Sequence, residues 1–229
     1  MNFVITADGS KTIFHETVGE HYHSKHGAVQ ESRHVFLQSG LQYLLQQGLA
    51  SQNEKVSILE VGFGTGLNFL LTADYCLKQN IKLTYTGIEA YPLEVEVIAQ
   101  TGYDKEVDAT LWHSFLEHYG QALSNPQCLV NEIDLTIAHQ EVLSFNSKQR
   151  VDVLYFDAFA AIHQPEMWTL ETLEHTCSFL KPGGVFVTYA ITGNLKRTMK
   201  SLGFSIEKAP GAPGKREMLR AVKISQCDD

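Results

Sequence analysis

The sequence is 229 residues long, 44% of them are hydrophobic, and its formal net charge is −8 at pH 7. This length predicts one α/β domain with additions. No apolar run is long enough to span a membrane and no charged-then-apolar leader opens the chain, so we expect a cytoplasmic protein without membrane contact. The four cysteines, Cys76, Cys128, Cys177 and Cys227, form no C-x-x-C pair, and we expect them to be reduced.

The charge is distributed unevenly along the chain. From Lys181 to Lys223, nine basic residues stand against two acidic residues, which gives this stretch a net charge of +7. A basic stretch on an otherwise acidic protein is typical of a surface that meets a polyanion. A solvated charged surface without a partner is an equally ordinary cause.

Residues 1–50 predict an N-terminal extension that packs on the core. Two short β-prone runs, Phe3–Thr6 and Thr12–Phe14, flank an Asp-Gly turn and predict a hairpin. Residues 22–34 are polar and aromatic with little periodicity, which indicates an ordered loop or one helical turn. Leucines at helical spacing then predict an amphipathic helix that ends near Gly48.

Histidines are concentrated in this extension. Five of the ten histidines fall between residues 15 and 34. Their spacing matches no zinc signature, and no cysteine or Glu-x-x-His pair joins them. We therefore predict no metal site.

Residues 56–71 are the most informative stretch. An apolar run, Val56–Val61, breaks into three alternating glycines, Gly62, Gly64 and Gly66, and then turns helical. This strand, loop and helix predict a nucleotide cradle, because glycines bring bare N–H groups to a ligand and the helix N-terminus adds its positive dipole end. The third glycine comes one residue too early for the G-x-G-x-x-G of dinucleotide enzymes, and no Gly-Lys-Ser/Thr follows for ATP.

The second predicted strand, Leu83–Glu89, ends in an acid. Glu89 follows the glycine loop at roughly the 20-residue interval at which an acid binds the ribose hydroxyls of a nucleoside cofactor. A solvent-exposed glutamate is the alternative.

The rest of the chain alternates between predicted helices and strands. Helices are expected at 93–100, 111–123, 170–180 and 194–202, and strands at 135–143, 151–157, 185–189, 204–206 and 218–222. The alternation predicts a Rossmann-like doubly wound α/β fold over residues 51–229, with ligands at the carboxyl ends of the strands. Asp157 directly follows the strand at 151–157, so its side chain either faces the ligand crevice or caps the next helix.

Four short blocks, in order and at matching intervals, resemble one family. They are Gly62-Phe63-Gly64-Thr65-Gly66-Leu67-Asn68-Phe69, Ile88–Leu93, Phe156–Phe159 with Gln164–Thr169, and Gly214–Leu219. They are similar to the tRNA 5-methylaminomethyl-2-thiouridine methyltransferases, namely the stand-alone MnmD proteins and the methyltransferase half of the bifunctional MnmC enzymes. The likeness runs from about Tyr22 to Ala221.

The resemblance implies a class I fold that uses S-adenosylmethionine (SAM) and methylates the primary amine of 5-aminomethyl(-2-thio)uridine at the tRNA wobble position. We do not expect the flavin oxidase domain of the bifunctional relatives in this chain. The family usually has a proline and a nearby lysine where this chain has Ala161 and His163, and an acid where it has Gln140. The implied cofactor-binding residues are Glu60, Gly62, Gly64, Gly66, Asn68, Glu89, Gln140 and Glu141.

Asp157 is the expected catalytic residue, aligning the acceptor amine and stabilising the cation that forms. Phe159 and Trp168 are expected either to stack on the target base or to serve as core aromatics. Five basic residues are expected to contact tRNA phosphates: Lys196, Arg197, Lys200, Lys215 and Arg216. Two alternatives stay open, namely a methyltransferase for a small-molecule or protein amine, and a cofactor-binding module without catalysis.

Overall fold

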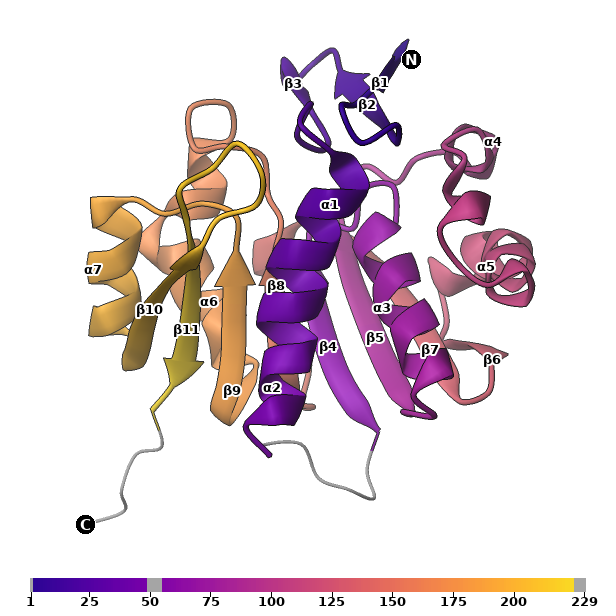
Figure 1. The fold of residues 1–229 in the computed structure, drawn as a ribbon. Coiled ribbons are helices and arrows are strands. Elements are labelled where there is room, and N and C mark those ends of the chain that lie inside the picture. Colours follow the sequence, from indigo (N-terminus) through magenta and orange to yellow (C-terminus); the bar gives the residue numbers. More distant parts are fainter. Residues whose placement is uncertain (1, 49–54, 225–229) are drawn as a thin grey trace.

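Eight strands form the central sheet of the computed structural model, which describes residues 2–48 and 55–224 (Figure 1). Their order across the sheet is β10-β11-β9-β8-β4-β5-β7-β6. The strands are β4 (Val56–Val61), β5 (Leu83–Glu89), β6 (Gln127–Val130), β7 (Ile133–His139), β8 (Val151–Phe156), β9 (Leu180–Thr188), β10 (Phe204–Pro210) and β11 (Glu217–Lys223). Strands β9, β8, β4, β5 and β7 run parallel, whereas β6, β10 and β11 pair antiparallel to their neighbours.

Helices cover both faces of this sheet, over two buried clusters. One face carries a continuous helical run, α1 (Ala28–Ser32), the π-helical η1 (Arg33–Gln42) and α2 (Tyr43–Gln46), together with α3 (Leu67–Lys78) and α5 (Ala109–Ala122). The other face carries α6 (Leu170–Ser178) and α7 (Gly193–Ser201). Shorter helices are α4 (Val95–Ala99), η2 (Tyr103–Lys105), η3 (Val142–Ser144) and η4 (Pro165–Trp168).

The two middle strands, β4 and β8, determine where the ligand crevice lies. Every residue of β8 is buried, as expected for a parallel strand covered on both faces. From β4 the chain continues to its neighbour β5 on one side, and from β8 to its neighbour β9 on the other. A doubly wound sheet binds its ligand where the strand order reverses, so the crevice belongs at the carboxyl ends of β4 and β8.

The predicted doubly wound fold is confirmed, with local differences; strand β9, for example, begins at Leu180 and not at residue 185 as predicted. The first helix already begins at Ala28, within the stretch predicted as a loop or single turn. The predicted strand at 135–143 is β7, which ends at His139, and the unpredicted edge strand β6 precedes it. Strand β10 extends to Pro210 because it pairs with β11 along its whole length.

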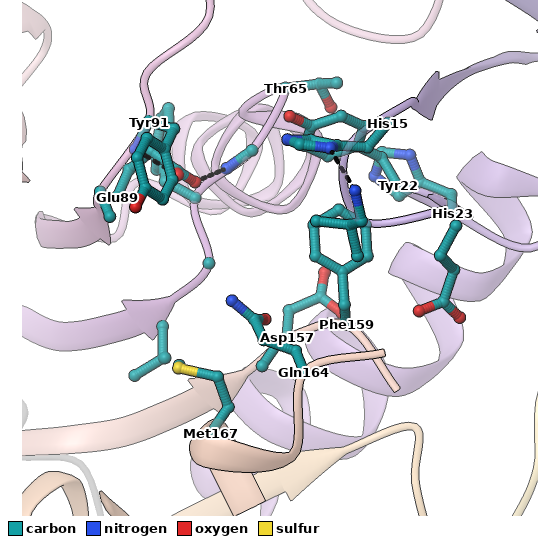
Figure 2. Close-up of a pocket in the computed structure, with 18 of the residues that line it drawn as sticks. His15, Tyr22, His23, Thr65, Glu89, Tyr91, Asp157, Phe159, Gln164 and Met167 are labelled. Atoms are coloured by element: carbon teal, nitrogen blue, oxygen red, sulfur yellow. Dashed lines mark hydrogen bonds between the residues drawn. The ribbon is translucent and has the colours of Figure 1, made fainter. Parts of the chain in front are cut away.

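The N-terminal residues form a small three-stranded sheet of β1 (Asn2–Ile5), β2 (Lys11–His15) and β3 (Glu20–His21). Figure 1 shows this sheet above the carboxyl ends of the central strands. Between the two sheets lies a cavity to which both contribute side chains (Figure 2). The N-terminal sheet therefore roofs the crevice.

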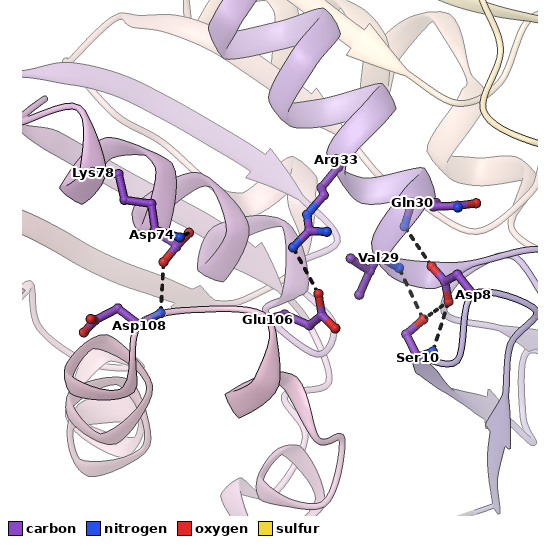
Figure 3. Close-up of polar contacts among 9 residues, drawn as sticks. All are labelled: Asp8, Ser10, Val29, Gln30, Arg33, Asp74, Lys78, Glu106 and Asp108. Carbon is purple, nitrogen blue, oxygen red and sulfur yellow. Dashed lines mark hydrogen bonds and ion pairs between the residues drawn. The ribbon is translucent and has the colours of Figure 1, made fainter.

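Side chains between β1 and β2 cap helix α1 and so hold this roof in place (Figure 3). Gly27 precedes α1 and brings no side chain to cap it. Instead, Asp8 Oδ2 accepts a hydrogen bond from the Gln30 N–H at 3.0 Å, and Ser10 Oγ accepts one from the Val29 N–H at 3.4 Å. This long-range cap explains why helix α1 begins in a stretch that shows no local helix signal.

Two sequence expectations fall partly on residues that are not described. The expected boundary between extension and core lies in 49–54, and Cys227 lies in 225–229, both outside the described ranges. Within those ranges Cys76, Cys128 and Cys177 are free thiols. No helix of residues 2–48 or 55–224 has the length and hydropathy of a membrane span.

Asp8→Ala should lower the free energy of unfolding by about 1–2 kcal/mol, since a helix cap of this kind is lost. Burial alone would raise the pKa of Asp8, but hydrogen bonds from Ser10, Thr6 and the Gln30 backbone outweigh burial and lower it. A lowered folded-state pKa means that the stabilisation is complete above the unfolded pKa and is lost as pH falls through the folded pKa. Urea titrations at pH 7 and pH 3 should therefore show a smaller deficit at pH 3. Asp104→Ala, at an exposed position, is the control; an equal loss in both variants would refute the capping role.

Candidate active site

A cavity of about 1070 Å³ opens at the carboxyl ends of the central strands (Figure 2). Its lining comes from the loops after β4, β5, β7, β8 and β9, from the N-terminal sheet, and from the loop between β10 and β11. Small-molecule sites commonly measure roughly 300–1,000 Å³. The cavity therefore has room for a nucleoside cofactor and for part of a second ligand.

Two of the three predicted glycines form the cavity floor. Gly62 has φ 83° and Gly64 has φ 54°, and both line the cavity. A Cβ at Gly62 would lie 2.5 Å from the carbonyl oxygen of Asp157, and one at Gly64 would lie 2.9 Å from the Tyr22 ring. Gly66 differs, because a Cβ there would meet Phe115 at 2.9 Å beneath the loop. All three glycines thus allow another part of the protein to pack closely against the loop, namely the Asp157 backbone, the Tyr22 ring and the Phe115 ring.

Glu89 holds this loop in place from the end of β5. Its Oε2 accepts a hydrogen bond from the Gly64 N–H at 2.9 Å, and its Oε1 accepts one from the Tyr91 N–H at 3.0 Å (Figure 2). A carboxylate offers about four acceptor positions, so two remain for ligand hydroxyls. Gln140 and Glu141 also line the cavity, as predicted for residues at the exit of β7.

A buried hydrogen-bond chain lies beneath the loop and reaches Asp157. Asn68 Nδ2 donates to Glu60 Oε1 at 2.7 Å and to Asp157 Oδ2 at 2.8 Å. The other oxygen of Glu60 accepts a hydrogen bond from the Tyr85 hydroxyl at 2.8 Å. Glu60 is fully buried and does not line the cavity, so this geometry does not fit the predicted direct contact with the cofactor. Asn68 does line it, and its buried Oδ1 has no partner among the described residues.

Asp157 faces the cavity and does not cap the next helix. Thr169 caps α6 with its own side chain, which leaves the Asp157 carboxylate to the site. The pKa of Asp157 is raised to about 8, chiefly by burial and also by Glu31 and Glu20, whereas the Asn68 hydrogen bond and Lys215 act against that rise. A carboxyl group with a pKa near physiological pH is suited to exchange a proton with a bound ligand.

Aromatic rings line the part of the cavity next to Asp157. The Phe159 ring lies 5.3 Å from that of Tyr22 and 5.5 Å from that of His15, between centroids. Figure 2 shows Asp157, Phe159 and Gln164 together and Glu89 with Tyr91 on the opposite side.

Trp168 supports this wall from outside the cavity. Its Nε1 donates to the Phe159 carbonyl at 2.8 Å, and its ring packs edge-on against Phe156 at 5.1 Å. Of the two expectations for these aromatics, Phe159 fits contact with a ligand and Trp168 fits the core.

Several residues that line the cavity were not predicted from the sequence. Tyr189 directly follows β9, so the strand-end rule that selected Glu89 and Asp157 could have found it. Glu20, Tyr22 and Glu31 come from the N-terminal extension, and only the tertiary fold brings them to the cavity.

The five predicted phosphate-binding residues fall into two groups. Lys196, Arg197 and Lys200 lie on α7, and Arg216 is exposed beside the β10–β11 loop; none of these four lines the cavity. Lys215 points inward instead, where its Nζ donates to Glu31 Oε2 at 2.8 Å and lies 4.0 Å from the centroid of the Tyr189 ring. The predicted phosphate contact of Lys215 does not fit this position.

The histidines of the extension do not gather into a metal site. Over residues 2–48 and 55–224, no group of three or more His, Cys, Asp or Glu side chains is arranged to hold a metal ion.

A sequence model described as S-adenosyl-L-methionine-dependent methyltransferase matches residues 104–224, a stretch that includes Asp157. Curated relatives are named tRNA 5-methylaminomethyl-2-thiouridine biosynthesis bifunctional protein MnmC. The protein of this name from Idiomarina loihiensis is 32% identical over 89% of this chain and 35% of its own length. That from Leptospira interrogans is 30% identical over 94% of this chain and 34% of its own length. The chain thus spans about a third of the length of the relatives it matches.

Solved structures share the fold. MNMC2 from Aquifex aeolicus superimposes with a TM-score of 0.77 and 22% identity, over 96% of this chain and 69% of that one. Magnesium protoporphyrin IX methyltransferase from Synechocystis, solved with bound SAM, superimposes with a TM-score of 0.53 and 14% identity, over 86% of this chain and 81% of that one.

Glu89→Ala should weaken SAM binding by about 1.5–3 kcal/mol, the range for hydrogen bonds to a charged group. Isothermal titration calorimetry measures the effect directly. Glu96→Ala, at an exposed position on α4, is the matched control and should bind SAM as the parent does. Unchanged affinity in Glu89→Ala would remove Glu89 from the cofactor site.

Proposed function

The chain belongs to the S-adenosyl-L-methionine-dependent methyltransferases, and from that membership we propose that it methylates the primary amine of 5-aminomethyl(-2-thio)uridine at the wobble position of tRNA. The product is 5-methylaminomethyl(-2-thio)uridine. Support for this acceptor comes from the MnmC relatives, whose names carry that nucleoside, and from the match along nearly the whole chain. Because its acceptor would be tRNA, we expect the protein to act in the cytoplasm.

The observation that carries the proposal is the position of Asp157. This carboxyl group has a pKa of about 8, and the aromatic rings of Phe159 and Tyr22 line the cavity beside it. It also lies next to the glycine loop that would hold the cofactor. An amine acceptor requires a nearby proton acceptor, and an aromatic wall suits a nucleobase.

The residues of the cavity fit SAM. Gly62 and Gly64 line the cavity, and the buried Asn68 Oδ1 is a hydrogen-bond acceptor without a protein partner among the described residues. Glu89 would hold the ribose, and Gln140 with Glu141 would lie at the adenine. When bound, SAM supplies an electrophilic methyl group on a positively charged sulfur.

The proton of the acceptor is the main chemical obstacle. An alkyl amine resembles lysine, whose reference pKa is about 10.4, and only the free amine is a nucleophile. Transfer of its proton to an ordinary carboxylate, with a pKa of about 3.9, is unfavourable by about six to seven pH units. Transfer to Asp157 is unfavourable by only about two to three pH units, since the pKa of Asp157 is about 8. Asp157 therefore accepts the proton and lies beside the cation that forms.

The acceptor would enter from the aromatic side. Phe159 and Tyr22 would stack on the flipped base, while Lys196, Arg197, Lys200 and Arg216 would contact phosphates outside the cavity. We also retain the division into an extension, residues 1–50, and a methyltransferase domain, residues 51–229.

Asp157→Asn keeps the shape and can still accept the Asn68 hydrogen bond, but it cannot take up the proton of the amine. Methyl transfer should slow by about a hundredfold or more, the scale of one preorganised electrostatic contact, with little change in SAM affinity. Single-turnover transfer of labelled methyl groups to tRNA that carries aminomethyluridine measures this. The parent rate should rise as pH passes through about 8 and Asp157 ionises, and the variant should lack this step. A near-normal rate in the variant would reduce Asp157 to a spectator.

Lys196→Glu with Lys200→Glu should weaken tRNA binding and flatten its dependence on salt. Each lost phosphate contact should reduce the slope of log affinity against log salt by about 0.7–0.9, because fewer counterions are released. Filter binding over a salt series measures the slope, and SAM affinity should not change. The control reverses the same charge at two exposed lysines elsewhere, Lys105→Glu with Lys148→Glu. If the two double variants bound tRNA equally, a small-molecule or protein amine would become the better acceptor.

A further inference from the structure

Glu31 and Lys215 form an ion pair inside the cavity, from opposite ends of the chain. Glu31 belongs to α1 and Lys215 to the loop between β10 and β11, and their charged atoms are 2.8 Å apart. The Glu31 side chain is only 10% exposed. Its Oε1 accepts a further hydrogen bond from the Ser24 N–H at 3.1 Å, so both of its oxygens are held.

The position of Lys215 is fixed as firmly. Gly214, with φ 88°, packs so closely that a Cβ there would lie 2.6 Å from the ring of His26. The Lys215 ammonium lies over the Tyr189 ring, an arrangement that attracts a cation. The Tyr189 hydroxyl donates in turn to the Ala158 carbonyl at 3.0 Å, directly after Asp157. The ion pair is therefore joined to the loop that carries Asp157.

We propose that Glu31 and Lys215 are positioning residues that together set the protonation state of Asp157, and hence the pH range in which an amine is methylated. This inference rests on the proposed function of the site. The inference does not require Glu31 or Lys215 to touch the acceptor.

The two charges act on Asp157 in opposite directions. Glu31 disfavours a second negative charge nearby and raises the pKa of Asp157, whereas Lys215 favours that charge and lowers the pKa. Both charges line the same cavity as Asp157, so the pair sets the two effects against each other. The charged or titratable groups around Asp157 are Glu20 of β3, Glu31 of α1, Glu60 of β4, Tyr85 of β5, Tyr189 after β9, and Lys215.

The competing explanation is a purely structural tie between the extension and the C-terminal hairpin. A tie would affect stability, and removing either partner would have the same consequence. A charge balance predicts instead that the two single substitutions have opposite effects and that the double substitution restores the parent. The pH profile distinguishes the two explanations.

The test compares Glu31→Gln, Lys215→Met and the double variant in single-turnover methyl transfer to aminomethyluridine tRNA across pH 6–10. We expect the acidic limb of the profile to move down by roughly one pH unit in Glu31→Gln and up by a similar amount in Lys215→Met. The double variant should return to within a few tenths of a unit of the parent, and Lys215→Arg should keep the parental limb. Shifts in the same direction, or no shift in either single variant, would overturn the proposal.

A second readout requires no acceptor. In protein labelled with ¹³C-carboxyl aspartate and saturated with S-adenosylhomocysteine, the Asp157 resonance, assigned by its loss in Asp157→Asn, should titrate near pH 8 and shift in the same opposite directions. If the parent methylated no tRNA but these shifts appeared, the proposed function would fall and the charge balance would stand.

The control removes a comparable pair outside the cavity. Lys208 and Glu217 are 4.0 Å apart on the same hairpin and are more exposed than Glu31 and Lys215. Lys208→Met with Glu217→Gln should leave the Asp157 titration unchanged. A shift there as large as in the cavity variants would count against a local effect of Glu31 and Lys215.

Discussion

The site depends on how a buried carboxyl group and one that faces the cavity share one amide. Asn68 Nδ2 has two hydrogens, and it gives one to Glu60 and one to Asp157. Two carboxylates that share one amide repel each other, which favours a proton on at least one of them. The pKa of Glu60 is raised well above its usual value by burial and then by Asp157. Glu60 thus favours its protonated form beneath the cavity, and Asn68 connects it to Asp157.

The doubly wound core builds only one half of the cavity. The glycine loop and Glu89 are continuous with β4 and β5, so the part of the cavity proposed for the cofactor follows from the core fold itself. The part proposed for the acceptor needs the roof, because Glu20, Tyr22 and Glu31 all come from the N-terminal extension. Glu20 Oε2 accepts a hydrogen bond from the Ala160 N–H at 2.8 Å and so joins the roof to the loop after β8. The extension therefore supplies chemical groups as well as cover.

Local signals in the sequence predicted the core well. The strand before the glycine loop, the strand that ends at Glu89 and the strand that precedes Asp157 are all as expected, because apolar runs and turn residues act over short distances. What the sequence could not reveal depends on partners far along the chain. Helix α1 is capped by Asp8, and Glu60 lies beneath the loop because Tyr85 and Asn68 hold it there. Periodicity carries no information on such contacts.

The basic C-terminal stretch shows why summed charge differs from available charge. Five of its nine cations are already engaged: Lys181 with Asp152, Lys208 with Glu217, Lys215 with Glu31, Arg220 with Glu207, and Lys223 with the Cys177 and Leu180 carbonyls. Among the described residues, the four with neither an ion pair nor such a carbonyl contact are Lys196, Arg197, Lys200 and Arg216, and all four lie outside the cavity.

The cavity interior has the opposite charge. Six acidic side chains line it, Glu20, Glu31, Glu89, Glu94, Glu141 and Asp157, against two lysines, Lys25 and Lys215. A negative interior suits a positively charged cofactor and an ammonium group, whereas it repels phosphate. If the acceptor is the proposed tRNA, its polyanionic backbone would stay at the surface while a base that carries an amine would enter the cavity. The separation of charge between surface and cavity would in this way select an aminomethyl group presented on a nucleic acid.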